Sequence, residues 1–171
     1  MVTRSKARFL AAAIWLPMLT AACGTSSQRS TSRSSGRSAT VATVGTTTGR
    51  DGTYLTDGSG RALYMWVGDD SGKSNCDADC VTAWPPLVTG ASPRATGGAT
   101  SAALGTLTRD DAGRQVTYKG HPLYYFAADT GPGTTKGQGS NSFGARWWLV
   151  APSGAAITKN ASSSVAPPVG Y

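Results

Sequence analysis

A ten-residue segment occurs twice in this chain, and this duplication limits the possible folds more than any other feature. Residues 60–69 read GRALYMWVGD, and residues 120–129 read GHPLYYFAAD. Both segments fit the pattern Gly-x-x-Leu-Tyr-x-aromatic-x-x-Asp without a gap. An internal repeat of this kind indicates two copies of one supersecondary unit. We therefore expect two homologous units packed into one small domain.

Each copy has the composition of a β-hairpin. Residues 57–60 read DGSG, which favours a tight turn, and strand-forming residues flank that turn at 53–56 and 62–67. The second copy has a turn at 110–113 and a strand at 114–118. Because Glu is absent and Lys and Leu are scarce, long helices are not expected. The predicted fold is mainly β with at most short helical turns, one of them from about Asp77 to 83 and capped by Asp77 or Asn75.

Alternation along the repeated strand puts apolar side chains on both faces. In the first copy Leu63, Met65 and Val67 oppose Tyr64 and Trp66. In the second copy Leu123 and Tyr125 oppose Tyr124 and Phe126. Neither face is polar, so each strand is expected to lie between two packed layers. The repeated aromatic residues are then core residues, and a ligand-stacking platform is the alternative. We interpret the Asp that closes each copy, Asp69 and Asp129, as a turn residue rather than as an acid catalyst.

The N-terminal 22 residues have the features of an export signal. Three basic residues precede a mostly apolar run at 9–22 that ends in small residues. The run is shorter than the roughly 20 residues that a membrane-spanning helix needs, and Pro17 interrupts it. We expect a signal peptide at 1–22, with an unremoved membrane anchor as the alternative.

The signal ends at a cysteine. Residues 19–24 read LTAACG and resemble the lipobox of bacterial lipoproteins, although Leu19 lies one position earlier than usual and Thr20 takes its place. The resemblance implies that Cys23 is acylated and becomes the N-terminus. Two or more acyl chains suffice for stable anchoring. We expect an extracytoplasmic protein that a lipid on Cys23 anchors to the cell membrane.

The distribution of charge argues against a nucleic-acid partner. The net charge is +7, but seven of the sixteen basic residues lie in the first fifty positions, and from residue 51 onward nine basic residues balance nine Asp. The segment 23–50 is rich in Ser, Thr and Arg and poor in large apolar residues, which predicts a disordered tether. We expect a β-rich domain at 51–160, with repeats at about 51–90 and 104–152, and a disordered tail at 161–171.

Cys76 and Cys80 carry the one distinctive chemistry of the expected domain. In an exported protein a disulfide between them is the default. The alternative is an extracytoplasmic site for a soft metal such as Cu(I), or a thiol redox centre, in which His121 or Met65 completes the ligand set. A calcium site at Asp69, Asp70, Asp77 and Asp79 does not match the EF-hand spacing.

No sequence pattern predicts an enzyme or a bound cofactor. Glu is absent, and His121, the one His, has no nucleophile at a recognisable motif spacing. Residues 131–137 read GPGTTKG and resemble a phosphate-binding loop, but they lack its Gly-Lys-Ser/Thr ending. The prediction is a binding or structural module whose ligand or protein partner is unknown.

The predicted domain is similar to one bacterial family. Both copies of Tyr-x-(Phe/Trp/Tyr)-x-x-Asp, the Cys76 to Leu87 segment with its AWPPL ending, and residues 136–148 resemble the lipoprotein family called the secreted repeat of unknown function. The resemblance covers roughly residues 51–152. It implies an exported, usually lipid-anchored protein with two repeats, and it implies no activity, substrate or cofactor.

Overall fold

The structure is a computed structural model that describes residues 40–158. The predicted signal peptide, Cys23, most of the predicted tether and the tail at 161–171 lie outside the described residues. Within the described part, no helix has the length and apolar character needed to cross a bilayer.

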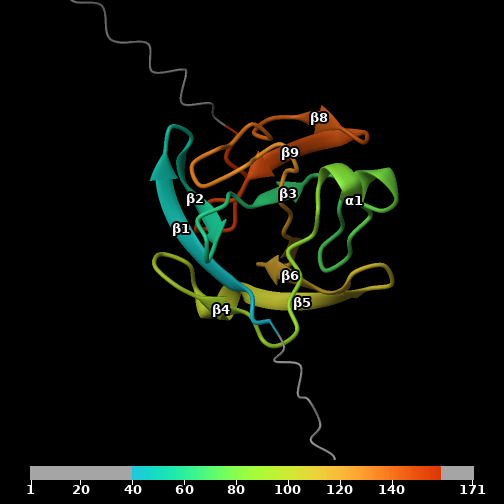
Figure 1. Cartoon of the computed structure of the whole chain (residues 1–171), viewed down its shortest axis with the longest axis horizontal. Helices are drawn as coiled ribbons and strands as arrows, with labels where there is room; N and C mark the ends of the chain where they lie inside the picture. Colours follow the sequence, from blue (N-terminus) through green and yellow to red (C-terminus); the bar gives the residue numbers. More distant parts are fainter. Residues whose placement is uncertain (1–39, 159–171) are drawn as a thin grey trace, which may run out of the picture. The chain divides into compact units, whose positions relative to one another are not determined.

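Short strands dominate the described part of the chain, as the sequence predicts (Figure 1). The elements are β1 (Thr43–Gly49), β2 (Gly52–Asp57), β3 (Tyr64–Trp66), α1 (Asp79–Ala83), β4 (Arg94–Ala95), a 3-10 turn (Ser101–Ala103), β5 (Leu104–Arg109), β6 (Gly113–Tyr118), β7 (His121–Pro122), β8 (Asn141–Ser142) and β9 (Ala145–Leu149). They form three small sheets, ordered β2-β1-β4, β3-β9-β8 and β5-β6-β7. The mainly β fold class is confirmed.

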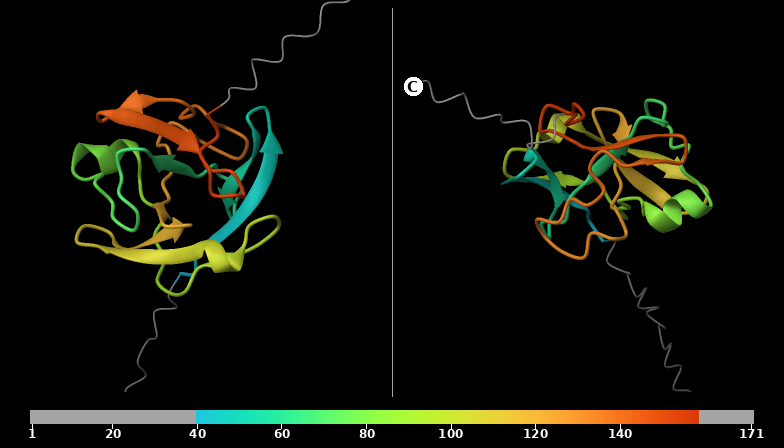
Figure 2. Two further views of the ribbon diagram at one scale, coloured as in Figure 1. Left: turned by 180° about the vertical axis from the view of Figure 1, so that it is seen from behind. Right: turned by 90° about the horizontal axis from the view of Figure 1, so that it is seen from above.

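The two copies build the same hairpin. Antiparallel β1 and β2 in the first copy correspond to antiparallel β5 and β6 in the second, and Figure 2 shows both hairpins from two further sides. In each copy the repeated leucine folds back on the preceding strand: Leu63 N donates to Leu55 O and Leu123 N to Val116 O, both at 3.0 Å. The predicted strands at 53–56 and 114–118 are therefore present as β2 and β6.

The copies meet at the repeated tyrosines. Tyr64 N donates to Tyr124 O at 2.9 Å, and Tyr124 N donates to Tyr64 O at 3.0 Å. This reciprocal pair of bonds relates the two repeats by an approximate two-fold axis. The prediction of two homologous units packed together in one domain is confirmed.

Each repeated strand lies between two apolar clusters, as alternation predicts. Leu63 and Met65 belong to one cluster, and Tyr64 and Trp66 belong to the other. Val67 departs from the pattern because β3 ends at Trp66, and its side chain is 57% exposed.

The start of the domain corrects the predicted boundary. We expected the tether to extend to residue 50, but residues 43–49 form β1, which pairs with all of β2. Val44 is fully buried in the first cluster. The segment resembles a linker because only one large apolar side chain faces the core and the remaining positions are Thr and Gly.

The helix also differs from the sequence-based prediction. α1 begins at Asp79, and its N-cap residue is Ala78, with no side-chain hydrogen bond. The backbone carbonyl of Asp77 accepts from Cys80 N at 2.8 Å instead. The expected side-chain cap from Asn75 or Asp77 is therefore wrong.

The close packing of the core predicts different changes in stability when two glycines of the same loop are replaced by alanine. A Cβ on Gly137 would lie 2.7 Å from Cη2 of Trp84 and 3.0 Å from Cζ of Tyr64, whereas a Cβ on Gly131 would meet nothing within 4 Å. We expect Gly137→Ala to lower the free energy of unfolding by about 1–3 kcal/mol through overpacking. Gly131→Ala is the matched control and should leave urea unfolding unchanged. Equal effects of the two substitutions would contradict this packing.

Candidate functional site

The repeated tyrosine and aspartate form two crossed pairs. Tyr64 Oη donates to Asp129 Oδ2 at 2.6 Å, and Tyr124 Oη donates to Asp69 Oδ2 at 2.7 Å. The second oxygen of each carboxylate accepts a loop amide: Asp69 Oδ1 that of Asn75 and Asp129 Oδ1 that of Lys136, both at 2.8 Å. Each aspartate therefore fixes the loop of its own repeat, as expected for a turn residue, and also binds the tyrosine of the other repeat.

Burial fixes the ionisation of these tyrosines. Both side chains have zero exposure. Burial is the main reason why the pKa of Tyr64 and that of Tyr124 lie far above 10, and the neighbouring carboxylates raise them further. Both hydroxyls therefore keep their protons and act as hydrogen-bond donors. Burial also raises the pKa of Asp69, which the bonds from Asn75 and Tyr124 oppose.

The aromatic residues of the motif, Trp66 and Phe126, stack on two tryptophans that do not belong to the motif. Trp84 and Trp147 stack at a centroid distance of 3.9 Å and an interplanar angle of 3°. Trp66 packs on the outer face of Trp147 at 5.4 Å, and Phe126 packs on the outer face of Trp84 at 4.4 Å. Trp84, Trp147 and Trp66 are buried and Phe126 is partly buried against them, so these residues serve as core rather than as an open stacking platform.

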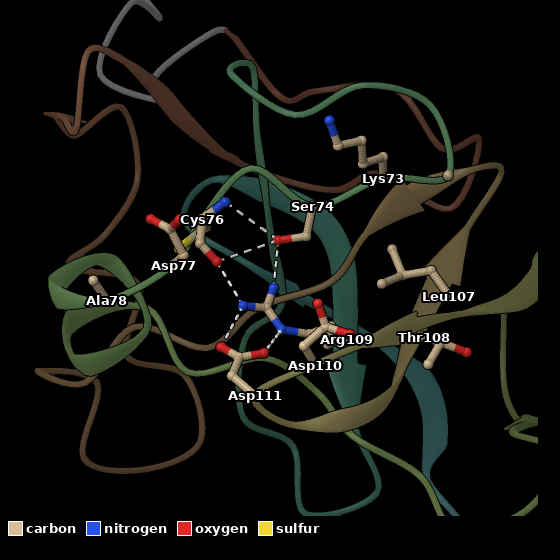
Figure 3. A pocket seen from close by; sticks show the side chains of 11 residues that line it. Lys73, Ser74, Cys76, Asp77, Ala78, Leu107, Thr108, Arg109, Asp110 and Asp111 are labelled. Carbon is tan, nitrogen blue, oxygen red and sulfur yellow. Dashed lines mark hydrogen bonds and ion pairs between the residues drawn. The ribbon is translucent and has the colours of Figure 1, made fainter.

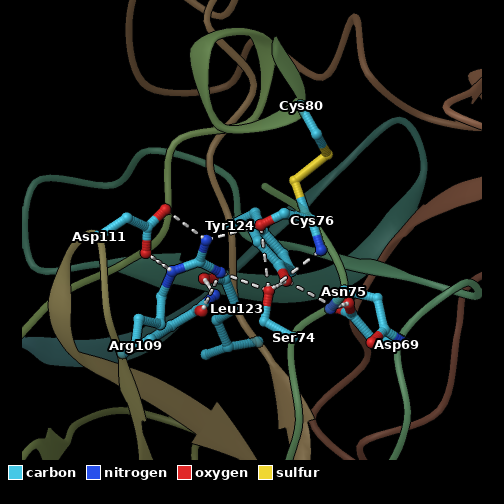
Figure 4. Close-up of polar contacts among 10 residues, drawn as sticks. Asp69, Ser74, Asn75, Cys76, Cys80, Arg109, Asp111, Leu123 and Tyr124 are labelled. Atoms are coloured by element: carbon cyan, nitrogen blue, oxygen red, sulfur yellow. Dashed lines mark hydrogen bonds and ion pairs between the residues drawn. A yellow bond between two sulfur atoms is a disulfide. The ribbon is translucent and has the colours of Figure 1, made fainter. Parts of the chain in front are cut away.

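A buried arginine extends the Tyr124–Asp69 pair (Figure 4). The Arg109 side chain is 5% exposed and donates to Asp111 Oδ1 and Oδ2 at 2.7 Å, to Cys76 O at 2.6 Å and to Gln115 Oε1 at 3.1 Å. It also donates to Ser74 Oγ, which lies 2.7 Å from Tyr124 Oη. Because Tyr124 gives its proton to Asp69, Ser74 is the donor to Tyr124.

A cavity of about 400 Å³ opens beside Arg109 (Figure 3). Its charged lining residues are Arg109, Lys73, Asp77, Asp110 and Asp111. The guanidinium of Arg109 is already engaged on all sides, and carboxylates outnumber cations in the lining. The cations that line this cavity are therefore already balanced by carboxylates of the chain, and the guanidinium of Arg109 has no free donor for a ligand.

The predicted disulfide between Cys76 and Cys80 is present in the structure. It joins the loop to α1, and both residues are buried in the second cluster. The sulfur atoms are paired with each other, so in this form they offer no thiolate to a metal.

The other residues of the alternative metal site lie apart from the disulfide. Met65 belongs to the first cluster, and His121 lies in β7. Among residues 40–158, no three His, Cys, Asp or Glu side chains group as a metal site would require.

Sequence reasoning identified the motif residues but missed their partners. Arg109, Ser74 and Gln115 carry no repeat signal, because the equivalent position in the other copy holds a different residue in each case. The place of Trp147 in the core could be predicted in part from the sequence, because Trp147 follows the second loop as Trp84 follows the first. The crossed pairing could not be predicted from the sequence, because alternation along a strand shows on which face a side chain lies but not which side chain it contacts.

The geometry defines a class of protein: a two-repeat β domain in which crossed Tyr–Asp pairs and an aromatic stack join the repeats. The family model described as "secreted repeat of unknown function" matches residues 45–88 and 105–151, which together make up more than half of the chain. The chain therefore belongs to this family, and the protein is extracytoplasmic. No curated protein and no solved structure matches it.

The crossed pairs predict which substitutions are energetically coupled. In a double-mutant cycle, Tyr64→Phe and Asp129→Asn should show a coupling of roughly 0.5–3 kcal/mol in urea unfolding, as side chains in direct contact do. The control cycle combines Tyr64→Phe with Asp69→Asn, which share no bond, and should be additive within about 0.5 kcal/mol. Stronger coupling in the control cycle would refute the crossed arrangement.

The Arg109–Asp111 contact predicts a dependence of stability on pH. Hydrogen bonding to Arg109 is the main reason why the pKa of Asp111 lies below its ordinary 3.8. The contact therefore stabilises the fold above pH 3.8, and this contribution disappears as the pH falls through the lower folded value. We expect Asp111→Asn to be less stable than the wild type at neutral pH, with a difference that shrinks below pH 3.8. Urea unfolding over a pH series measures it, and a constant difference would contradict the contact.

Proposed function

We propose that this protein is a lipid-anchored module of the cell envelope that binds or connects other components and catalyses no reaction. Acylation of Cys23 would hold it at the membrane, and residues 24–39 would separate the domain from the surface. The partner at the membrane is then the lipid bilayer itself, reached through the acyl chains.

The proposal rests on one observation: the reactive groups of the repeated motif are hydrogen-bonded to one another inside the fold. Tyr64 and Tyr124 are fully buried, and each hydroxyl is bonded to a carboxylate. Asp129 is 3% exposed, and both of its oxygens accept hydrogen bonds. A general acid or base must reach the proton that it transfers. The burial and the hydrogen bonds of these groups support a structural role, in which they form a scaffold that presents its loops.

The two loops that follow the motif are the parts this scaffold presents. The aspartates hold the loop amides of Asn75 and Lys136, and the disulfide closes the first loop further. Fixed loops on a rigid scaffold lower the entropic cost of binding. A binding module is therefore the role that this use of polar groups supports best.

Replacement of Cys23 tests the anchoring. We expect Cys23→Ala to release the protein into the medium or the soluble envelope fraction, because no acyl chain can then form. Ser26→Ala, in the same segment, is the matched control and should stay with the membrane. Immunoblotting of fractionated cells measures the distribution. Unchanged membrane association of Cys23→Ala would refute lipidation.

A wash with concentrated salt separates the lipid from simple charge attraction. The segment before the domain contains Arg29, Arg33 and Arg37, which can attract an anionic membrane. Salt screens that attraction and leaves acyl chains inserted. Wild-type protein should therefore stay with the membrane after the wash, and its release would indicate attachment by charge alone.

A further inference from the structure

The approximate two-fold axis gives the Arg109 cavity a counterpart in the other half of the domain. There the β1–β2 turn faces the glycine-rich loop, and a cavity of about 480 Å³ lies between them. It is lined by Arg50, Tyr54, Gly133, Thr134, Thr135 and Lys136. Thr135 follows Asp129 much as Ser74 follows Asp69, so the two cavities are built from equivalent elements.

The second cavity lacks the internal guanidinium that closes the first. Arg109 pairs with Gly113 at the end of its hairpin, and Gly49 pairs with Gly52 at the equivalent place. Gly49 has no side chain to fill the site. The position equivalent to Gln115, which binds Arg109, is Tyr54. The equivalent turn and loop therefore meet in the second half without an internal cation between them.

Tyr54 is left with an unused hydroxyl in this cavity. Its side chain is 1% exposed and lines the cavity, yet its hydroxyl has no hydrogen-bond partner within residues 40–158. A Cβ on Gly49 would lie 3.3 Å from this oxygen, so a side chain at that position would crowd the hydroxyl, and glycine allows the tyrosine to lie there. Burial, followed by the charges of Asp51 and Asp129, raises the pKa of Tyr54, which keeps the hydroxyl protonated as a donor. The hydroxyl is not among the fully buried unpaired atoms of the described residues, so it opens onto the cavity, where it can donate to a ligand with acceptor oxygens.

The charged residues that line the second cavity are both basic. Arg50 and Lys136 line it, and neither takes part in an ion pair within the described residues. Asp51 and Asp129 do not line the cavity. Asp51 Oδ2 accepts from Thr135 Oγ1 at 2.6 Å, and the oxygens of Asp129 accept from Tyr64 and Lys136. The carboxylates thus lie behind the wall with partners of their own, and cations and hydroxyls face the cavity.

We propose that this second cavity binds an oxyanion, a phosphate or carboxylate group, held between Arg50 and Lys136 with the Tyr54 hydroxyl donating to it. The ligand lies between the turn and loop equivalent to those that Arg109 bridges in the first half, and its charge is opposite to that of Arg109 because the charged lining residues here are basic. The site rests on the proposed binding role and names its ligand class, but it does not depend on acylation of Cys23. The fractionation of Cys23→Ala and the titration below therefore fail independently.

Titration of the full-length protein in a neutral detergent tests the site. Inorganic phosphate and acetate are added at constant ionic strength, with chloride as the reference, and the amide NMR signals of residues 133–136 are followed. We expect saturable shifts confined to this loop and the β1–β2 turn. The absence of a saturable shift with either anion, or equal shifts in the loop at 72–78, would overturn the proposal.

Matched variants assign the binding to the named groups. Lys136→Gln and Arg50→Gln should each weaken the affinity about tenfold, the size expected for one charge-assisted hydrogen bond. Lys73→Gln, on the other cavity, is the control and should change nothing. Tyr54→Phe keeps the ring and removes only the hydroxyl, so it should fold and bind roughly fivefold more weakly. Unchanged affinity in Tyr54→Phe, or a loss in Lys73→Gln equal to that in Lys136→Gln, would overturn the assignment.

Vesicles distinguish a lipid headgroup from a free anion as the source of the oxyanion. The Cys23→Ala full chain is mixed with phosphatidylcholine vesicles with and without an anionic phospholipid. Binding to the anionic vesicles that Lys136→Gln weakens and phosphate displaces supports the site and identifies a headgroup. Phosphate titration without such vesicle binding supports the site with a soluble anion as its ligand.

Discussion

The reciprocal contact between Tyr64 and Tyr124 holds this structure together. Their backbones exchange two hydrogen bonds, and their side chains reach past each other to the aspartate of the opposite repeat. A buried carboxylate is costly unless hydrogen bonds satisfy it. Here each carboxylate takes one bond from a tyrosine of the other copy and one from its own loop. The interface between the repeats and the position of the loops therefore depend on the same four side chains.

The two halves of the domain differ at one pair of equivalent positions, which holds Arg109 in one repeat and Gly49 in the other. In one half Arg109 occupies the space between hairpin and loop and satisfies its neighbours. In the other half the ring of Tyr54 packs against Gly49, no internal cation bridges hairpin and loop, and the Tyr54 side chain lines a cavity between them. The scaffold is common to both copies, and the difference lies in a few side chains around one cavity. Such a division would let one copy stabilise the domain while the other provides the proposed binding surface.

The sequence predicts the scaffold of this fold better than its polar contacts. The duplicated segment, the turn at 57–60 and the two apolar faces of each strand follow from local chemistry and periodicity. The spacing and compartment of Cys76 and Cys80 were enough to predict the disulfide. Residues 43–49 were misread because a strand with a single large core residue has the composition of a linker. Arg109 was not identified, because its burial depends on Ser74 and Cys76, which lie 35 and 33 residues away in the sequence.

The crossed exchange of tyrosine and aspartate bears on how such a domain could have originated. One unit alone would carry a tyrosine without its acid and an acid without its tyrosine, and half of its aromatic stack would face water. An ancestral chain of one unit would therefore have completed itself as a homodimer, with identical groups meeting across the axis. Fusion of two genes would then have freed the copies to diverge, which is how an arginine on one side can stand opposite a glycine on the other.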